Sequence, residues 1–416
     1  MNQISFYLLQ NPMAKISNHS SFHSPFQPTI ILLALVILIS HTIRRSHSAN
    51  LLNILDFGAI RGYDSSQAIH RAWAVACKSE ESTIVYIPKG RFLVQPIEFH
   101  GGGCHNEDIS FHIDGALIGP PDYRILGNVE SWLSFVEVNG VSLTGGVLYA
   151  NGEALWSCKF STTHCPVGAR TLSFRDSNNI RIRGLMSRNS QLFHIVINGC
   201  KNVLVEEVNV MAASNSPNTD GIHVETSTHV TIIDSTIQTG DDCISIGPGS
   251  YNIWIQRIRC GPGHGISIGS LAHNMNEPGV GNVTVSKAIF YGTQNGLRIK
   301  SWARPSTGFV YGVQFLGATM HNVQNPILID QHYCPNNINC PGQESGIKIS
   351  NIIYKDIVGT SATPIAIKFD CSSKNPCNGI RLEDVRLTYQ NEEAKSSCEY
   401  AKGKTLGLVQ PEGCFE

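Results

Sequence analysis

The sequence predicts an all-β protein, a single-domain parallel β-helix with a short capping helix at its N-terminal end. Runs of alternating Val and Ile recur along the middle of the chain, each after a polar residue, and they begin at Asn179, Asn202, His229, Asn252 and Asn282. Their spacings of 23, 27, 23 and 30 residues indicate a loosely repeated unit, in which each coil stacks on its neighbour. A β-sandwich is the alternative, but the Asn-Gly and Asp-Gly turns of regular hairpins rarely separate these runs.

The composition favours many turns and little helix. Gly numbers 38 and charged residues make up only 15% of the 416 residues, which suits an all-β chain. The formal net charge is −1; residues 1–48 hold three cations and no acid, so the remainder has 28 basic against 32 acidic residues. Such a chain offers no basic patch for nucleic acid, and an anionic ligand would need positive charge gathered locally.

The N-terminal segment has the pattern of a targeting signal. Ile30 to Ile39 is an unbroken apolar run of ten residues, shorter than the roughly 20 residues that span a bilayer but typical of a signal-peptide core. Because Arg44 and Arg45 follow the run, an uncleaved signal anchor is the alternative. We therefore expect residues 1–48 to be a signal peptide or anchor, with cleavage after Ser48, and residues 49–416 to form the β-helix domain.

The elements of that domain begin with a strand-like run from Leu51 to Phe57. An amphipathic helix is predicted over Ser66 to Cys77, and strands follow near Ile84 to Ile87 and Arg91 to Phe99. A lone helix ahead of a long β region is expected to cover the open end of the core. Later runs continue the repeat without a linker, at Val310 to Phe315, Ile347 to Tyr354 and Ile380 to Tyr389.

Thirteen cysteines indicate an oxidising compartment, and none forms the Cys-x-x-Cys pair of a zinc site. The odd count leaves at least one free thiol, for which Cys200, inside a strand-like run, is the candidate. Several cysteines lie close together in sequence, at Cys158/Cys165, Cys334/Cys340, Cys371/Cys377 and Cys398/Cys414. Asn282-Val-Thr284 is an N-glycosylation acceptor.

Conspicuous polar residues stand in Gly-rich settings between residues 216 and 302. If one coil takes about 22 residues, side chains that far apart lie above one another. Asp220 to Asp241 is 21 residues and Asp242 to His264 is 22, so the three acids and the histidine are predicted to form one patch. Arg298 follows His264 by 34 residues, which fits one coil with an inserted loop at about residues 272–280.

Lys300 would point to the same side of its strand as Arg298. Clustered carboxylates repel, so one is expected to keep its proton and act as an acid while another stays ionised as a base. Glycoside hydrolysis needs such a pair, and an Arg/Lys pair suits a sugar carboxylate. The alternatives are a purely structural turn at Asp220-Gly221 and a calcium site, although calcium prefers more oxygen ligands and no neighbouring cations.

Four segments, in this order and spacing, resemble the signature motifs of the polygalacturonases, and of the plant members in particular. They are Asn218-Thr-Asp-Gly221, Gly240-Asp-Asp-Cys243, Gly263-His-Gly265 and Arg298-Ile-Lys300. The likeness runs from about Asn53 to near the C-terminus. It implies a right-handed parallel β-helix and a pectin-degrading glycoside hydrolase with no metal or organic cofactor.

The resemblance also implies roles for matching residues. Asp241 would be the general acid, while Asp220 and Asp242 would hold and deprotonate the attacking water, with inversion at the anomeric carbon. His264 would assist the acid. Arg298, Lys300, Tyr333 and Asn218 would bind the substrate, the two cations gripping a galacturonate carboxylate. The disulfides that the resemblance makes most expected are Cys243/Cys260, Cys371/Cys377 and Cys398/Cys414.

Three departures from the family pattern lie outside these motifs. The segment from Gly58 to Ser66 lacks the usual longer acidic turn, His332 replaces a common Asn, and Ala272 replaces a Gly. The sequence therefore predicts an active, secreted, monomeric polygalacturonase of the cell wall, acting on α-1,4 bonds of de-esterified pectin. Alternatives are an exo-acting or substituted-galacturonan hydrolase, an inactive pectin-binding β-helix, and a calcium-dependent pectate lyase.

Overall fold

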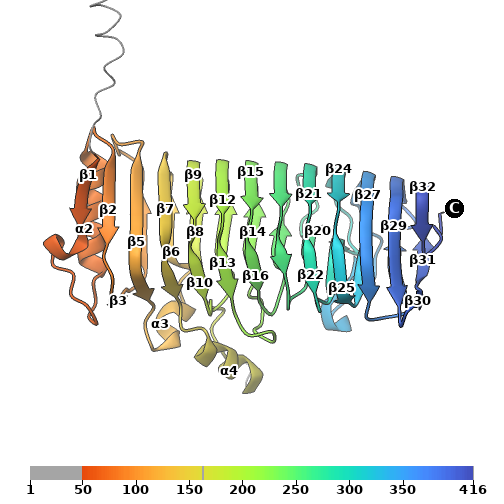
Figure 1. Cartoon of the computed structure of the whole chain (residues 1–416), viewed down its shortest axis with the longest axis horizontal. Helices are drawn as coiled ribbons and strands as arrows, with labels where there is room; N and C mark the ends of the chain where they lie inside the picture. Colours follow the sequence, from red (N-terminus) through yellow and green to blue (C-terminus); the bar gives the residue numbers. More distant parts are fainter. Residues whose placement is uncertain (1–48, 162–163, 416) are drawn as a thin grey trace, which may run out of the picture. The chain divides into compact units, whose positions relative to one another are not determined.

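The computed structural model describes residues 49–161 and 164–415, so the predicted signal segment 1–48 lies outside the described residues. Within the described part the chain winds into coils of parallel strands, stacked in sequence order (Figure 1). The predicted parallel β-helix is confirmed. A typical coil consists of β12 (Lys201–Glu206), β13 (Asn209–Met211) and β14 (Ile222–Glu225), each paired in parallel with the strands of the coils before and after.

One strand of each coil enters an 11-stranded sheet, and the others enter a 21-stranded sheet that bends around the rest of the core. The 11-stranded sheet contains β4 (Ile97–His100), β6 (Ser131–Val136), β8 (Arg170–Arg175), β11 (Ile195–Asn198), β14, β17 (Ile244–Ile246), β20 (Ile266–Leu271), β23 (Asn295–Trp302), β26 (Asn325–Tyr333), β28 (Ile365–Asp370) and β31 (Lys395–Glu399).

The 21-stranded sheet has a row of longer strands and a row of shorter ones. The longer row is β1 (Asn50–Asn53), β2 (Thr83–Ile87), β5 (Ile109–Ile118), β7 (Val141–Tyr149), β9 (Asn178–Arg183), β12, β15 (Thr228–Ile233), β18 (Tyr251–Gln256), β21 (Val280–Ser286), β24 (Phe309–Leu316), β27 (Lys348–Ser361), β29 (Cys377–Tyr389) and β32 (Ala401–Gln410). The shorter row is β3 (Arg91–Leu93), β10 (Met186–Arg188), β13, β16 (Thr236–Gln238), β19 (Arg259–Cys260), β22 (Ile289–Tyr291) and β25 (Thr319–Val323). The remaining strand, β30 (Glu392–Glu393), pairs antiparallel with β29.

The polar residue before each predicted run has a definite backbone role. Asn179, Asn202, His229, Asn252 and Asn282 all adopt a left-handed conformation, with φ between 55° and 58°. Asn tolerates this region better than most residues, and the side-chain amides also connect adjacent coils, as in the 3.2 Å bond from Asn202 to Asn179. The runs that follow pair in register, coil after coil. The predicted repeat is therefore confirmed.

The capping helix is confirmed as α2 (Ser66–Lys78). Its Trp73 packs at the N-terminal end of the core, with its ring centroid 5.4 Å from that of Phe99 and 6.0 Å from that of Phe111. The strand expected over Leu51 to Phe57 is only partly correct. The chain turns after Asn53 into η1 (Ile54–Phe57), because the Asn53 side chain accepts a hydrogen bond from the Leu55 N–H and starts a helical turn. The shortened segment after Gly58 is ordered, with a bridge from Asp64 to Leu93.

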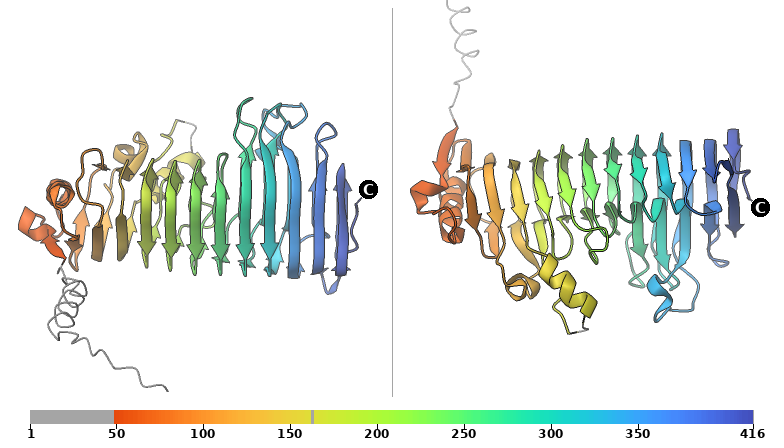
Figure 2. Two further views of the ribbon diagram at one scale, coloured as in Figure 1. Left: turned by 90° about the horizontal axis from the view of Figure 1, so that it is seen from above. Right: turned by 60° about the horizontal axis from the view of Figure 1, so that its bottom comes forward.

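Besides η1, three short helices in the described part of the chain have no counterpart in the sequence prediction. They are α3 (Tyr123–Gly127), α4 (Glu153–Ser161) and η2 (Pro335–Asn337). In α4 only Leu155 and Trp156 are buried, so the helix has no continuous apolar face and its sequence lacks a clear helical period. Figure 2 shows these helices and the longer loops standing out from the regular coils.

Six disulfides join described cysteines, and Cys200 is free and buried, as predicted. The Cys77–Cys104 disulfide connects the capping helix to the first coils and has no counterpart in the sequence prediction. Burial raises the pKa of the Cys200 thiol to about 11, which leaves it unreactive at neutral pH. The other five disulfides are the three pairs that the resemblance implied and two of the pairs close in sequence, namely Cys243–Cys260, Cys371–Cys377, Cys398–Cys414, Cys158–Cys165 and Cys334–Cys340.

The disulfide between Cys398 and Cys414 fastens the C-terminal end of the chain to the last coils. Cys398 lies in β31, whereas Cys414 lies beyond β32, outside any strand, and is half-buried. Their Cα atoms are 5.4 Å apart, within the range usual for a disulfide. The segment after β32 is thereby held against the sheet that contains β31.

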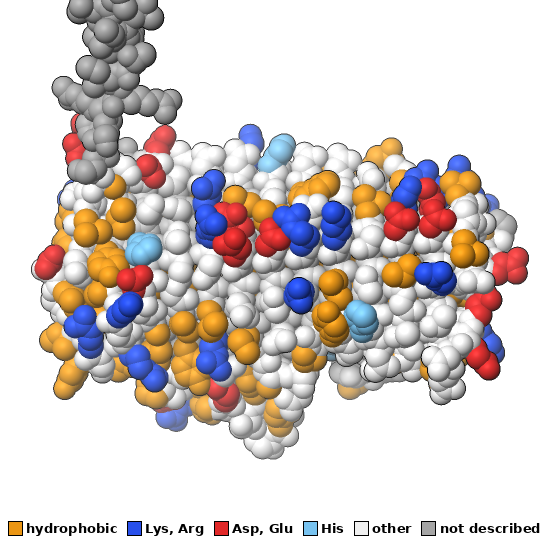
Figure 3. Space-filling view, viewed as in Figure 1, with side chains coloured by type: hydrophobic (Ala, Val, Ile, Leu, Met, Phe, Trp, Pro, Cys, Tyr) orange, Lys and Arg blue, Asp and Glu red, His pale blue; other side chains and the backbone are white. Residues whose placement is uncertain are grey.

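The face drawn in Figure 3 carries acidic and basic side chains in mixed rows. Ion pairs such as Arg183–Glu207 at 3.0 Å and Arg257–Asp234 at 2.5 Å connect neighbouring coils. Exposed pairs of this kind contribute about 0–1 kcal/mol each, so the stacked core and the strand ladders hold the coils together. Among the described residues, no helix is long and apolar enough to cross a membrane.

Candidate active site

The 11-stranded sheet aligns the candidate catalytic residues one above another. Ile222, Ile244 and Ile266 pair in register on three successive coils, and Asp220, Asp242 and His264 each lie two residues before one of them. The predicted patch therefore exists, but the residue offset by which its members stack needs a correction. Asp242 stacks on Asp220, because the offset between these coils is 22 residues and not the 21 that separate Asp220 from Asp241.

Arg298 needs a similar correction, since it pairs with Ser267 and does not stack on His264. The predicted inserted loop is present between Leu271 and Val280, where the chain leaves β20 and enters β21. The buried Glu277 carboxylate closes this loop by accepting the backbone N–H groups of Ala272 at 2.7 Å and His273 at 2.9 Å.

Asp242 is the most heavily bonded carboxylate of the site and is only 1% exposed. Its Oδ1 accepts hydrogen bonds from the Ser267 hydroxyl at 2.8 Å and from the Arg298 guanidinium at 2.6 Å, while its Oδ2 accepts one from Lys300 Nζ at 2.7 Å. Burial alone would raise the pKa of Asp242, but the charges of Lys300 and Arg298 outweigh it and lower the pKa to about 2. Asp242 is therefore ionised at neutral pH.

Asp220 has the opposite electrostatic environment. It is 6% exposed, and its one side-chain hydrogen bond among the described residues comes from the Ser245 hydroxyl to Oδ2, at 2.6 Å. Burial raises the pKa of Asp220 well above its ordinary value, and the charges of Asp241 and Asp242 raise it further. The expected division of neighbouring carboxyls into a proton holder and an ionised base is present. The raised pKa falls on Asp220.

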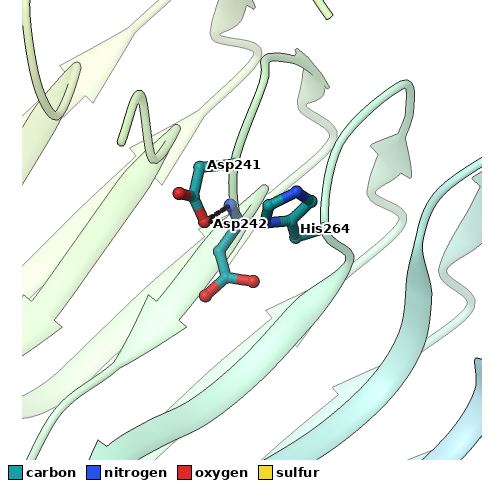
Figure 4. Close-up of side chains that lie close together, drawn as sticks. All are labelled: Asp241, Asp242 and His264. Atoms are coloured by element: carbon teal, nitrogen blue, oxygen red, sulfur yellow. Dashed lines mark hydrogen bonds and ion pairs between the residues drawn. The ribbon is translucent and has the colours of Figure 1, made fainter. Parts of the chain in front are cut away.

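Asp241 and His264 complete the cluster, with Asp242, at the ends of two neighbouring strands (Figure 4). Asp241 Oδ1 accepts the backbone N–H of Asp242 at 2.8 Å and lies 3.0 Å from His264 Nδ1. The Asp241 side chain is 18% exposed, more than either of the other two aspartates. Asp241 is thus the carboxyl most open to a ligand in the groove.

Distance alone would allow a metal ion here, because one ligand atom each from Asp241, Asp242 and His264 lie within 4.8 Å of one another. The charges argue against it. Both Asp242 oxygens already bond Lys300 or Arg298, and a divalent cation would be placed against these two fixed positive charges. The donor set also provides fewer oxygens than calcium prefers.

A groove runs along the outer face of the 11-stranded sheet and contains the aspartates. Its lining includes Asn218 and Lys300, and Tyr333 lies at its end, with the ring centroid 5.1 Å from Lys300 Nζ. Of the predicted substrate-binding residues, Arg298 does not line this groove. Its guanidinium is instead bonded to Asp242 and to the Ser267 hydroxyl, at 2.6 and 2.9 Å.

The sequence reasoning missed the side chains that hold the aspartates. Ser245 bonds Asp220 and Ser267 bonds Asp242, each from the next coil. A signal was present, because His223, Ser245 and Ser267 each follow the aligned polar residue by three positions and lie between two apolar residues. Such a residue points outward from its strand, on the same side as the catalytic groups.

Neighbouring carboxyls in opposite electrostatic environments, beside an open groove, suit glycoside hydrolysis, which uses one carboxylic acid and one carboxylate. Fold and site together define a β-helical glycoside hydrolase. Comparison with known proteins makes this assignment specific. The family model described as glycosyl hydrolases family 28 matches residues 77–408, and the chain belongs to that family.

The matched range is narrower than the likeness expected from about Asn53 to near the C-terminus. Cys414 lies beyond its last residue, 408, whereas Cys243, Cys260 and the other cysteines that the resemblance paired lie inside it. The family match therefore does not extend to the Cys398–Cys414 disulfide, and the geometry of the folded chain alone carries that pairing.

Named relatives cover most of the chain. A polygalacturonase of Prunus persica is 57% identical over 85% of this chain and 90% of its own length. An exopolygalacturonase of Platanus acerifolia is 39% identical over 88% of this chain and 97% of its own. Among solved structures, an endo-xylogalacturonan hydrolase from Aspergillus tubingensis superposes with a TM-score of 0.75 at 22% identity, over 86% of this chain and 99% of the other. At this identity the structural match shows the shared fold alone.

Proposed function

We propose that this protein is a polygalacturonase that hydrolyses α-1,4-galacturonosyl bonds of de-esterified pectin with inversion. The observation that carries the proposal is the network of three aspartates and two cations in an open groove. Support comes from the four motifs and from the relatives, among them the 57% identical polygalacturonase of Prunus persica.

Charge balance gives the proton state of the site. Asp242 is ionised, and we assign one proton to the pair of Asp220 and Asp241, because burial and the neighbouring carboxylate charges raise the pKa of Asp220. Two negative charges then remain, and they match the charges of Lys300 and Arg298, which hold Asp242 at 2.6 to 2.7 Å. The active form has the proton on Asp241 and a charged Asp220.

In this form Asp241, the most exposed of the three, donates its proton to the glycosidic oxygen. Asp220 and Asp242 hold the attacking water, and Asp220 takes the proton because its raised pKa makes it the stronger base. His264, 3.0 Å from Asp241 Oδ1, positions the acid. No metal is used in these steps.

Lys300 and Tyr333 supply the contact with a galacturonate carboxylate and its sugar ring, and Asn218, which also lines the groove, contributes a polar contact. Arg298 supports them by fixing Asp242 and Ser267. Lysine suits its single bond to Asp242 as a point charge, whereas the rigid fork of arginine suits two fixed partners.

The proposal includes the cellular setting. Residues 1–48 direct secretion, residues 49–416 form the catalytic domain, and the protein acts as a monomer outside the cell. Six disulfides suit an oxidising compartment. Asn282, exposed at the start of its run, is the proposed glycan acceptor.

The test is the product profile on polygalacturonic acid, for the wild-type protein and for Asp241→Asn. The wild type should release reducing ends, and Asp241→Asn should lose this activity with an unchanged melting temperature. A ladder of oligomers indicates endo action and early monomer alone indicates exo action. A wild-type protein that binds the polymer without cleaving it, or that releases unsaturated products absorbing in the ultraviolet, would refute the proposal.

A further inference from the structure

Asp220 is connected to the groove surface by a continuous row of polar side chains. Its Oδ2 accepts the Ser245 hydroxyl at 2.6 Å, and the Ser245 oxygen lies 2.8 Å from His223 Nδ1. The other ring nitrogen of His223, Nε2, lies 3.6 Å from a Glu225 carboxylate oxygen. Four side chains from two adjacent strands, β14 and β17, and the turn before β14 thus lead away from the proposed base.

The direction of these hydrogen bonds depends on the proton of Asp220. Ser245 has a single hydroxyl hydrogen, so when it donates to a charged Asp220 its oxygen must accept from a protonated Nδ1 of His223. When Asp220 carries a proton it can donate to Ser245, which then donates to an unprotonated Nδ1. Changing from the second arrangement to the first moves one proton from Asp220 to His223, and each intermediate group gives up one hydrogen as it gains another.

The hydrolytic reaction creates a need for such a transfer. In each turnover Asp241 gives a proton to the leaving oxygen and Asp220 takes one from the water. The site therefore ends with its proton on Asp220, whereas the active form has it on Asp241. Asp220 is only 6% exposed, and a sugar bound in the groove would cover it further. The site is ready again only when Asp220 has lost this proton and Asp241 has regained one.

We propose that Ser245 and His223 form a proton path that removes the proton from Asp220 after each turnover and delivers it to Glu225 and solvent. The inference rests on the proposed hydrolytic function. Ser245 loses its hydrogen to His223 Nδ1 as it receives the one from Asp220, and the Nε2 proton of His223 passes to Glu225 or to water. His223 returns to its starting tautomer before the next turnover by taking up one proton at Nε2 from solvent and releasing the Nδ1 proton to solvent. Asp241 recovers its proton from solvent, so no net proton is gained or lost.

The coil above Ser245 provides an internal comparison. His223, Ser245, Ser267 and Arg298 pair in one register row. Ser267 bonds Asp242 as Ser245 bonds Asp220, but its other partner is Arg298 Nε at 2.9 Å. Arginine does not exchange its proton at neutral pH. Within this row, Asp220, which has to release a proton, is connected through Ser245 to a histidine, whereas Asp242 is connected through Ser267 to an arginine.

The charged surroundings of the path suit its outer end. His223 lines the groove with its side chain 18% exposed, and the Phe193 ring lies 5.0 Å from the imidazole. Glu225 is more exposed, at 37%. Its interaction with His223 is the largest effect lowering the Glu225 pKa, and Arg170 and His273 also lower it. Glu225 thus remains a charged acceptor beside the imidazole.

The test uses His223→Gln, because glutamine can still donate a hydrogen bond to Ser245 but cannot carry a proton. We expect kcat on polygalacturonic acid in dilute buffer to fall roughly tenfold, less than the loss of a directly acting acid or base, with KM unchanged. Added imidazole, at constant pH and ionic strength, should restore kcat by replacing the missing group. His321→Gln, remote on β25 and stacked on Tyr291, is the matched control and should behave as wild type.

A purely structural His223 predicts instead that His223→Gln keeps the wild-type kcat, or loses activity that imidazole does not restore, and either result overturns the path. If His223→Gln has a lowered melting temperature, Glu225→Gln gives a second readout through the same buffer dependence. A wild-type protein without hydrolytic activity would overturn the proposed function itself. Activity with no buffer effect in the variants would overturn the proton path alone.

Discussion

The two stacked aspartates, Asp220 and Asp242, are expected to affect stability in opposite directions when each is changed to asparagine. In Asp242→Asn the amide removes the charge that Lys300 and Arg298 hold in a nearly dry site. The pKa of Asp242 falls from an ordinary 3.8 to about 2, and a lowering of this size favours the charged form over the neutral form by roughly 2 kcal/mol. Asp242→Asn should cost about this much, or more because two buried cations lose a partner.

Asp220→Asn should do the reverse, because the folded state disfavours a charge at this position. Both variants are expected to lose hydrolytic activity, yet at pH 7 Asp242→Asn should melt at a lower temperature than wild type and Asp220→Asn at a higher one. Thermal melts followed by circular dichroism measure the difference. Equal melting temperatures for the two variants would refute the electrostatic division described here.

The pH dependence provides a second check on the same variants. A carboxyl whose folded pKa is lowered stabilises the protein above its unfolded pKa and loses this effect as the pH falls through the folded pKa. For Asp242 the window is from about 4 to about 2. In this window the gap between wild type and Asp242→Asn should close, and a constant gap would contradict the assignment.

Three further predictions concern the surroundings of the site. Lys300→Ala should raise KM for polygalacturonic acid and also lower kcat, since Lys300 bonds Asp242; Lys368→Ala, two coils further on and 44% exposed, is the control, and equal kinetics in both would count against the binding role. Replacing both Cys243 and Cys260 by Ala should cost about 3 kcal/mol, from a cross-link that spans 17 residues; an unchanged melting temperature would show that the stacked coils need no such link. A chelator should leave the hydrolytic rate unchanged, and a loss restored by calcium would favour the lyase alternative.

The repeat was readable from the sequence because it depends on local rules. Alternation along a strand places Ile222, Ile244 and Ile266 in the core, and the left-handed bend accepts Asn at the start of each run. The capping helix could be located for the same reason, since α2 presents one apolar face. Helix α4 could not, because its two buried residues form no periodic pattern.

The candidate site was found by its motifs, and the approximate coil length brought its residues together. The sequence could not determine which aspartate stacks on which, because a shift of one residue moves a side chain to the other face of a strand. Only the register of β14 and β17 places Asp242 above Asp220. Only the folded structure brings Lys300 and Arg298 to Asp242 while burying Asp220 without a cation bonded to it.

By itself, then, the sequence determined the β-helix, the candidate site cluster and the class of enzyme, since these follow from short periods and contiguous motifs. The tertiary structure decided the opposite electrostatic environments of Asp220 and Asp242, and the serine and histidine that lead away from Asp220. These depend on distances of about 3 Å or less between groups more than 20 residues apart in the chain. Such distances are set by how the coils stack, and no local pattern records them.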